Sequence, residues 1–102
     1  MDIILDGPTL VLHGDFDVRS TWEVRTAIYE RLESYDDDVV IDMTGVFTVD
    51  ATALRLIAVA TRHAWLTGHH LTVRNPGPAV RRMLHLTRLA HAIEVERIAA
   101  TA

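Results

Sequence analysis

The chain has 102 residues, a common length for one domain, and 49% of them are hydrophobic while 24% are charged. Its formal net charge of −4 argues against nucleic acid as a partner, and no stretch is apolar for long enough to span a membrane. Cysteine and lysine are both absent, which excludes disulfides, thiolate sites and lysine-dependent chemistry such as Schiff bases. The first residues show neither the basic region nor the apolar run of a signal peptide, so we expect a cytoplasmic protein without membrane insertion.

The first residues predict a β-hairpin. Two β-prone runs, Ile3–Leu5 and Leu10–His13, are joined by an Asp-Gly-Pro turn. The segment Gly14–Asp17 carries a glycine and two aspartates, which favour a loop that ends the second run.

A helix and a buried strand follow. Ser20 and Glu23 fit a capping box, which predicts a helix over Thr21–Ser34. Val39–Ile41 is a continuous apolar run, typical of a strand that is covered on both faces. We expect Thr44–Val49 to be a loop after this strand.

The second half of the chain repeats the alternation of helix and strand. Asp50 is a good N-cap for a second helix and Gly68 a good C-cap. Leu71–Arg74 predicts a short strand, Pro78 suits the first position of a third helix, and Ile93–Val95 predicts a last strand. The predicted inner face of the second helix consists of Leu54, Ile57, Ala58, Thr61 and Trp65.

This order of elements predicts one α/β domain over residues 1–102, with a frayed tail from about residue 98. We expect a mixed, mostly parallel sheet with an N-terminal hairpin and about three to four helices. In such a sheet the loops that leave the carboxyl ends of parallel strands gather at one edge, where partners bind. The predicted partner-binding edge consists of Asp15, Asp17, Val18, Thr48, Asp50, Thr52, Arg55 and Asn75.

Thr52 is the candidate switch residue of this edge. With Asp50 as N-cap, Thr52 is the second residue of its helix, beside free backbone N–H groups and the positive end of the helix dipole. A phosphate on Thr52 would be favoured there, and it would add about −1.5 to −2 charges near Asp15 and Asp17. An ordinary polar residue in a first helical turn also accounts for Thr52.

Several segments together resemble a known family. Val39–Leu54, which reads VVIDMTGVFTVDATAL, resembles the central segment of STAS domains. Within that family it is most similar to the anti-sigma-factor antagonists, whose usual pattern is an apolar strand followed by Asp-Ser-Ser-Gly-Leu. Leu12–Asp17 resembles the family's Leu-x-Gly-Glu-Leu-Asp, Ala64–Leu71 its Ala-x-x-x-Gly-x-x-Leu, and Val80–Leu89 its closing helix.

The resemblance implies a regulatory binding module that is not an enzyme and needs no cofactor. In that family the unphosphorylated domain captures an anti-sigma-factor serine/threonine kinase and so frees a sigma factor. The kinase phosphorylates the second serine of the pattern, and a PP2C-type phosphatase removes the phosphate. Thr52 matches the phosphoacceptor and Asp50 the aspartate, while Ala51 and Ala53 replace a serine and a glycine, and Arg88 replaces a glycine of the closing helix. Ala53 adds a Cβ where we expect a partner's backbone to approach.

Other functions stay open. A STAS subunit of an ABC-type lipid transporter would dock on an ATPase through the same surface without phosphorylation, and so would a scaffold subunit of a stress-sensing complex. A phosphotransfer receiver would hold Mg²⁺ with Asp15, Asp17 and Asp50, but receivers also use a lysine, which this chain lacks. His69 and His70 are neighbours in a predicted strand and point to opposite faces, so we expect no metal site.

Overall fold

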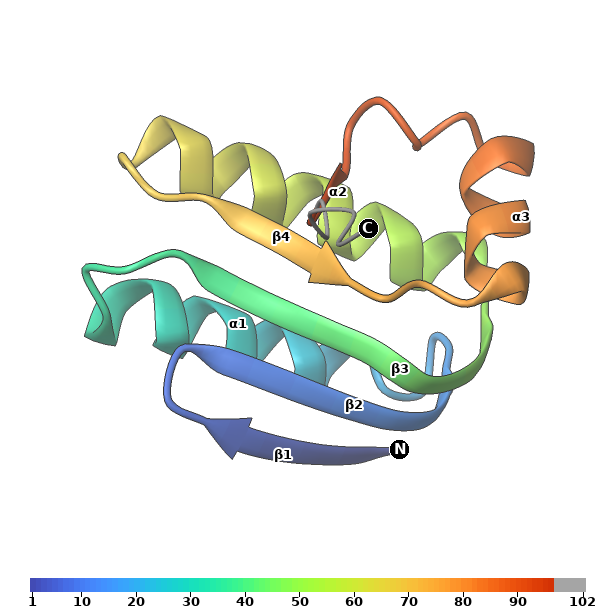
Figure 1. Ribbon diagram of the computed structural model, residues 1–102, viewed down its shortest axis with the longest axis horizontal. Coiled ribbons are helices and arrows are strands. Elements are labelled where there is room, and N and C mark those ends of the chain that lie inside the picture. Colours follow the sequence, from blue (N-terminus) through green and yellow to red (C-terminus); the bar gives the residue numbers. More distant parts are fainter. Residues whose placement is uncertain (97–102) are drawn as a thin grey trace, which may run out of the picture.

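The computed structural model describes residues 1–96, which form one sheet with helices packed against it (Figure 1). The elements are β1 (Asp2–Asp6), β2 (Thr9–Phe16), α1 (Thr21–Ser34), β3 (Val39–Val49), α2 (Ala51–Leu66), β4 (Leu71–Arg74), α3 (Pro78–Leu86) and β5 (Glu94–Val95). In the described residues the sheet has the order β1-β2-β3-β4-β5, with β1 antiparallel to β2 and the other pairs parallel. The predicted fold class is confirmed, with three helices within residues 1–96; the tail expected from residue 98 lies outside the described residues.

The core lies between the sheet and the two long helices. Figure 1 shows α1 and α2 side by side against one face of the sheet, while α3 packs against β3. In the first part of β3 and in β4 every second residue points into this layer, and past the register irregularities of β3 the buried residues are three apart. The fully or almost fully buried side chains include Leu10, Leu12, Phe16, Ile28, Ile41, Met43, Leu54, Ile57, Leu71 and Val73.

Both segments predicted as loops before the binding edge are mostly strand. The predictions of loops at Gly14–Asp17 and Thr44–Val49 are wrong, because β2 and β3 stay paired up to Phe16 and Val49. The longer β3 accommodates extra residues through two register irregularities. At one of them a Cβ on Gly45 would lie 2.5 Å from the His13 ring, so only glycine fits without a shift. The predicted edge therefore starts from the ends of two long paired strands.

Helix α1 has the predicted bounds but not the predicted cap. Ser20 is at the N-cap position, yet its side chain makes no capping hydrogen bond, so the capping box with Glu23 is not formed. The reason is the backbone of Ser20, which is already helical (φ −105°, ψ −5°), whereas a capping side chain needs an extended residue. The Thr21 hydroxyl instead donates to the carbonyl of Val18 at 2.9 Å.

Helix α2 packs on the sheet through a face slightly different from the predicted one. Leu54 and Ile57 are buried as predicted, but Trp65 is 69% exposed. The other buried residues of α2 are small, namely Ala53, Ala60 and Ala64. These residues define the buried face of α2, and Trp65 falls outside that face, so its indole is in solvent.

Helices α2 and α3 end in the same hydrogen-bond pattern. After α2, the N–H of Gly68 donates to Trp65 and the N–H of His69 to Ala64, which is a Schellman motif with Gly68 at φ 84°. After α3, Arg88 (φ 60°) and Leu89 donate in the same way to His85 and Leu84. Arg88 thus occupies a left-handed position that favours glycine, which explains why a glycine at this point of the family pattern is suited to the fold.

Replacing Arg88 by glycine should stabilise the protein. The side chain of Arg88 is exposed, so its loss removes little, and glycine relieves a left-handed conformation. Glycine also gives the unfolded chain more conformational entropy, which offsets part of this gain. We expect Arg88→Gly to raise the free energy of unfolding by about 0.5–1 kcal/mol, as measured by urea denaturation. The matched control is Arg82→Gly inside α3, which should lower it by about 1 kcal/mol. A loss of stability in both variants would contradict this account.

Strand β5 is short, and an ion pair lies at each end of its pairing with β4. The strand begins at Glu94, one residue later than predicted, and Ile93 is buried just before it. Arg74 pairs with Glu96 at 2.6 Å, and the Nδ1 atom of His70 lies 3.2 Å from Glu94. The hydrogen bond with Glu94, and then its negative charge, raise the pKa of His70 above the ordinary value of 6.5.

This pKa shift makes the attachment of β5 sensitive to pH. Because the folded-state pKa is the higher one, the contribution of the pair is fully present below pH 6.5 and is lost as the pH rises through the folded pKa of His70. Titration of the His70 ring by NMR should give a pKa above 6.5, and Glu94→Gln should bring it back toward 6.5. Glu33→Gln, which removes an exposed carboxylate on α1, should leave it unchanged. An unshifted pKa of His70 in the unmodified protein would refute the pairing.

Candidate functional site

Asp50 connects the start of α2 to the loop between β2 and α1. One carboxylate oxygen accepts a hydrogen bond from the N–H of Ala53 at 2.8 Å, which caps the helix as predicted. The other oxygen accepts from the N–H of Val18 at 3.0 Å, and the N–H of Asp50 itself donates to the carbonyl of Phe16 at 3.2 Å. A single side chain therefore fixes two segments of the predicted edge relative to each other.

Thr52 lies in the first turn of α2 with its side chain exposed. No hydrogen bond of its hydroxyl to another part of residues 1–96 is found, so the hydroxyl is available to solvent or a partner. The first N–H groups of a helix have no partner within the helix; the side chain of Asp50 accepts from Ala53 and its carbonyl from Leu54, which leaves the N–H groups of Ala51 and Thr52. The surroundings of the hydroxyl thus combine free donors with the positive end of the helix dipole.

The two alanines beside Thr52 point away from the surface to different degrees. Ala51 is half-buried, and Ala53 is fully buried in the core with 0% exposure. The expectation that the Cβ of Ala53 meets an approaching partner is therefore wrong. As the third residue of α2, Ala53 faces the sheet, and its methyl group packs inside the domain.

The acidic residues of the edge are engaged with neighbours. The Thr48 hydroxyl donates to Asp15 at 2.7 Å, across the register pair that joins the ends of β2 and β3. Asp17 forms an ion pair with Arg19 at 2.7 Å. Hydrogen bonds from the side chain and backbone of Arg19 lower the pKa of Asp17 below its ordinary value. Arg19 was missed from the sequence, although an arginine two residues after an aspartate in a loop could have indicated the pair.

Asn75 and Arg55 lie on other parts of this end of the domain. Asn75 has a left-handed backbone (φ 51°) and donates to the hydroxyl of Thr44 at 3.2 Å, so it is joined to the middle of β3 rather than to Asp50. Arg55 is exposed on α2, one turn beyond Thr52. The structure therefore joins Val18 to Asp50 at the start of α2 and Asp15 to Thr48 at the ends of β2 and β3, while Asp17 bonds to Arg19 and Thr52 follows Asp50 in the first turn of α2.

Exposed apolar side chains also lie at this end: Val18 belongs to the predicted edge, whereas Trp22 and Phe47 were not included in it. Val18 is 61% exposed next to the N–H that Asp50 holds, and Trp22 is 73% exposed in the first turn of α1. Phe47, near the end of β3, is 63% exposed and packs edge-on against His13 with 5.4 Å between ring centroids. Large apolar side chains that stay in water are a common mark of a binding surface when they gather with polar groups.

Two further observations concern metal sites and membrane spans. Within residues 1–96, no three histidine, aspartate or glutamate side chains come together in a way that could hold a metal ion. None of the helices in the same range is long and apolar enough to cross a membrane.

Removing the carboxylate of Asp50 should destabilise the domain. Asp50→Ala loses the cap of α2 and the tie to Val18, and we expect the free energy of unfolding to fall by about 1–2 kcal/mol. Asp50→Asn keeps an oxygen for the cap and should lose less. Asp17→Ala is the matched control, because its ion pair is at the surface and should change stability by less than about 1 kcal/mol. Urea denaturation measures all three, and equal losses in Asp50→Ala and Asp17→Ala would rule out the bridging role.

Comparison with known proteins places this arrangement in a family. Residues 2–96 match the family model described as "Mlab, STAS domain". No curated protein matches the chain in sequence.

Several solved structures have a similar fold. A candidate anti-sigma factor antagonist from Thermotoga maritima aligns with a TM-score of 0.76 and 14% identity, over 97% of this chain and 87% of that one. The unphosphorylated anti-sigma factor antagonist SpoIIAA aligns with a TM-score of 0.71 and 16% identity, over 94% of this chain and 87% of that one. An anti-sigma factor antagonist from Mycobacterium paratuberculosis aligns with a TM-score of 0.69 and 20% identity, over 94% of this chain and 83% of that one. TM-scores of 0.69 to 0.76 show a common fold, and the family model covers residues 2–96. The chain belongs to the STAS domain family.

Proposed function

We propose that this domain is an anti-sigma-factor antagonist, a regulatory binding module rather than an enzyme. Unphosphorylated, it captures an anti-sigma-factor kinase; phosphorylation of Thr52 releases the kinase, and a PP2C-type phosphatase restores the binding form. Three solved structures that share the fold are described as antagonists or candidate antagonists, one of them in its unphosphorylated form. The observation that carries the proposal is the exposed hydroxyl of Thr52 at a helix start that Asp50 holds in place.

The position of Thr52 explains how a phosphate could switch binding without unfolding the domain. The free N–H groups of the first turn and the helix dipole would stabilise a phosphate on the domain itself. The same phosphate adds about −1.5 to −2 charges to a surface that a partner must desolvate. A partner that contacts Val18 and the start of α2 would then meet a charge where it previously met a hydroxyl. Binding is lost although the fold is kept.

The neighbours of Thr52 are compatible with this role. The methyl group of Ala53 is buried, so it leaves the surface around the hydroxyl open to a kinase. A threonine is stiffer at χ1 than the serine of the family pattern, which favours a kinase whose site accepts the extra methyl group. Arg55 stands one turn further along the exposed side of α2 and would meet an acidic group of the partner.

A second candidate function uses the same surface. The family model that matches the chain carries the name Mlab and not the name of an antagonist. This observation favours a STAS subunit that docks on the ATPase of an ABC-type lipid transporter, or a scaffold subunit of a stress complex. In both cases Thr52 would contact the partner directly and carry no phosphate.

The proposal predicts selective phosphorylation at Thr52. Incubation with the cognate anti-sigma-factor kinase and ATP, followed by mass spectrometry, should place one phosphate on the unmodified protein and none on Thr52→Ala. Thr26→Ala removes an exposed hydroxyl from α1 and should be phosphorylated like the unmodified protein. Thr52→Glu should bind the kinase at least about tenfold more weakly. A tenfold change in affinity corresponds to about 1.4 kcal/mol, and an unpaired charge buried at an interface costs more than that.

The two candidate functions predict different results for the unmodified protein and the Thr52 variants. Uptake of phosphate by Thr52→Ala would disprove the assignment of the acceptor. An ATPase bound by the unmodified protein and lost with Thr52→Glu, with no phosphate on Thr52 in the cell, would support the transporter or scaffold role instead.

A further inference from the structure

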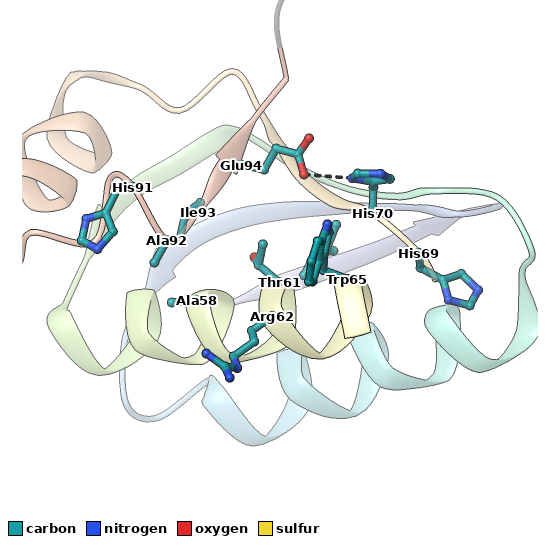
Figure 2. Close-up of a pocket in the computed structure, with 11 residues that line it drawn as sticks. Ala58, Thr61, Arg62, Trp65, His69, His70, His91, Ala92, Ile93 and Glu94 are labelled. Carbon is teal, nitrogen blue, oxygen red and sulfur yellow. Dashed lines mark hydrogen bonds and ion pairs between the residues drawn. The ribbon is translucent and has the colours of Figure 1, made fainter. Parts of the chain in front are cut away.

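A second concave site lies at the other end of α2. Figure 2 shows the residues around a cleft of about 480 Å³, which lies between the second half of α2, the start of β4 and the segment that leads into β5. With a rise of 1.5 Å per residue, Trp65 in this cleft is about 20 Å from Thr52 along the helix. The volume falls in the range of small-molecule sites. The cleft is therefore separate from the edge around Thr52.

The walls of the cleft are mainly apolar and include one flat aromatic surface. Leu71 and Ile93, at 1% and 4% exposure, belong to the core beneath it, and Ala58 adds a small side chain from α2. Trp65 stands in the cleft with 69% of its surface in water. Covering this indole with a planar ring would remove apolar area from water, at roughly 25 cal/mol for each Å².

One charged side chain at the cleft is left available to an anion. Its carboxylate, Glu94, is paired with His70 at 3.2 Å, and Figure 2 shows this pair close to Trp65. Arg62 stands one turn before Trp65, and in residues 1–96 it forms no ion pair. His91 on the opposite wall adds a ring nitrogen that can donate. Arg62 is thus the permanently charged group of the cleft that has no ion-pair partner in residues 1–96.

We propose that this cleft binds a small planar aromatic acid. The ring of the ligand stacks on the indole of Trp65, and its carboxylate pairs with the guanidinium of Arg62, which offers two parallel donors to such a group. This site does not depend on the function proposed for Thr52. It gives the domain a second binding site, for a metabolite-sized ligand.

Two-dimensional NMR with 2-naphthoate as the probe tests the site. The chain has two tryptophans, and both are exposed, so the indole N–H signal of Trp22 is an internal control for that of Trp65. The Trp65 signal should shift saturably with a Kd of about 1 mM or lower, as expected for a fragment of this size, while the Trp22 signal stays in place. The neutral analogue 2-naphthamide should bind roughly tenfold more weakly because it lacks the charge.

Variants separate the roles of the charge and the ring. Arg62→Gln should weaken 2-naphthoate binding roughly tenfold and leave 2-naphthamide binding unchanged, whereas Arg82→Gln on α3 should change neither. Thr52→Ala should bind the probe like the unmodified protein. Three results would each overturn the proposal: equal binding of the acid and the amide, an equal shift of the Trp22 signal, or no saturable shift of the Trp65 signal. The comparison of acid and amide uses the unmodified protein, so it holds even if a variant fails to fold.

Discussion

The parallel pairing of β2 with β3 is the constraint on which the rest of the domain depends. The pairing extends from Thr9 and Val40 to Phe16 and Val49, and its inward side chains form the centre of the core. Because β3 is paired so far, the chain leaves the sheet only at Asp50, where α2 begins at once. The same length brings the end of β2 beside the end of β3, so the loop into α1 lies within hydrogen-bond distance of Asp50. The position of the candidate switch follows from the length of one strand pair.

Asp50 converts this arrangement into a defined surface. A helix cap needs only one acceptor, and the second oxygen of the carboxylate is used to hold the N–H of Val18. The carboxylate therefore stabilises α2 and sets the position of an exposed apolar residue beside Thr52. Structure and candidate function share this residue, whereas Thr52 itself contributes little to the fold. A modification of Thr52 can change what binds there and leave the core intact.

Helix α2 presents different chemistry at its two ends. Its first turn carries a hydroxyl, free N–H groups and a nearby arginine, which suit a protein partner or a phosphate. Its last turns carry Trp65 and Arg62 above an apolar cleft, which suit a small planar anion. Both ends are available because the buried face of the helix consists largely of alanines, and these let α2 lie close to the sheet while its large side chains stay outside.

The sequence by itself determined the order of the elements, the bounds of α1, the N-cap at Asp50, the glycine that ends α2, the start of α3 at Pro78, and the family pattern around Thr52. These features are local: they depend on apolar periodicity, on cap residues and on glycine or proline at fixed positions. Only the tertiary structure decided how far β2 and β3 run, because strand ends depend on pairing with residues far along the chain.

Packing between elements also decided which side chains reach the surface. Trp65 falls on an apolar stripe in the sequence, but the buried face of α2 passes through Ala60 and Ala64 instead, so the indole stays largely exposed at the cleft. Ala53 falls beside the switch in the sequence, but the orientation of α2 on the sheet buries it. The second oxygen of Asp50 and the pairing of Asp17 with Arg19 likewise depend on how segments meet in space, which periodicity and spacing do not encode.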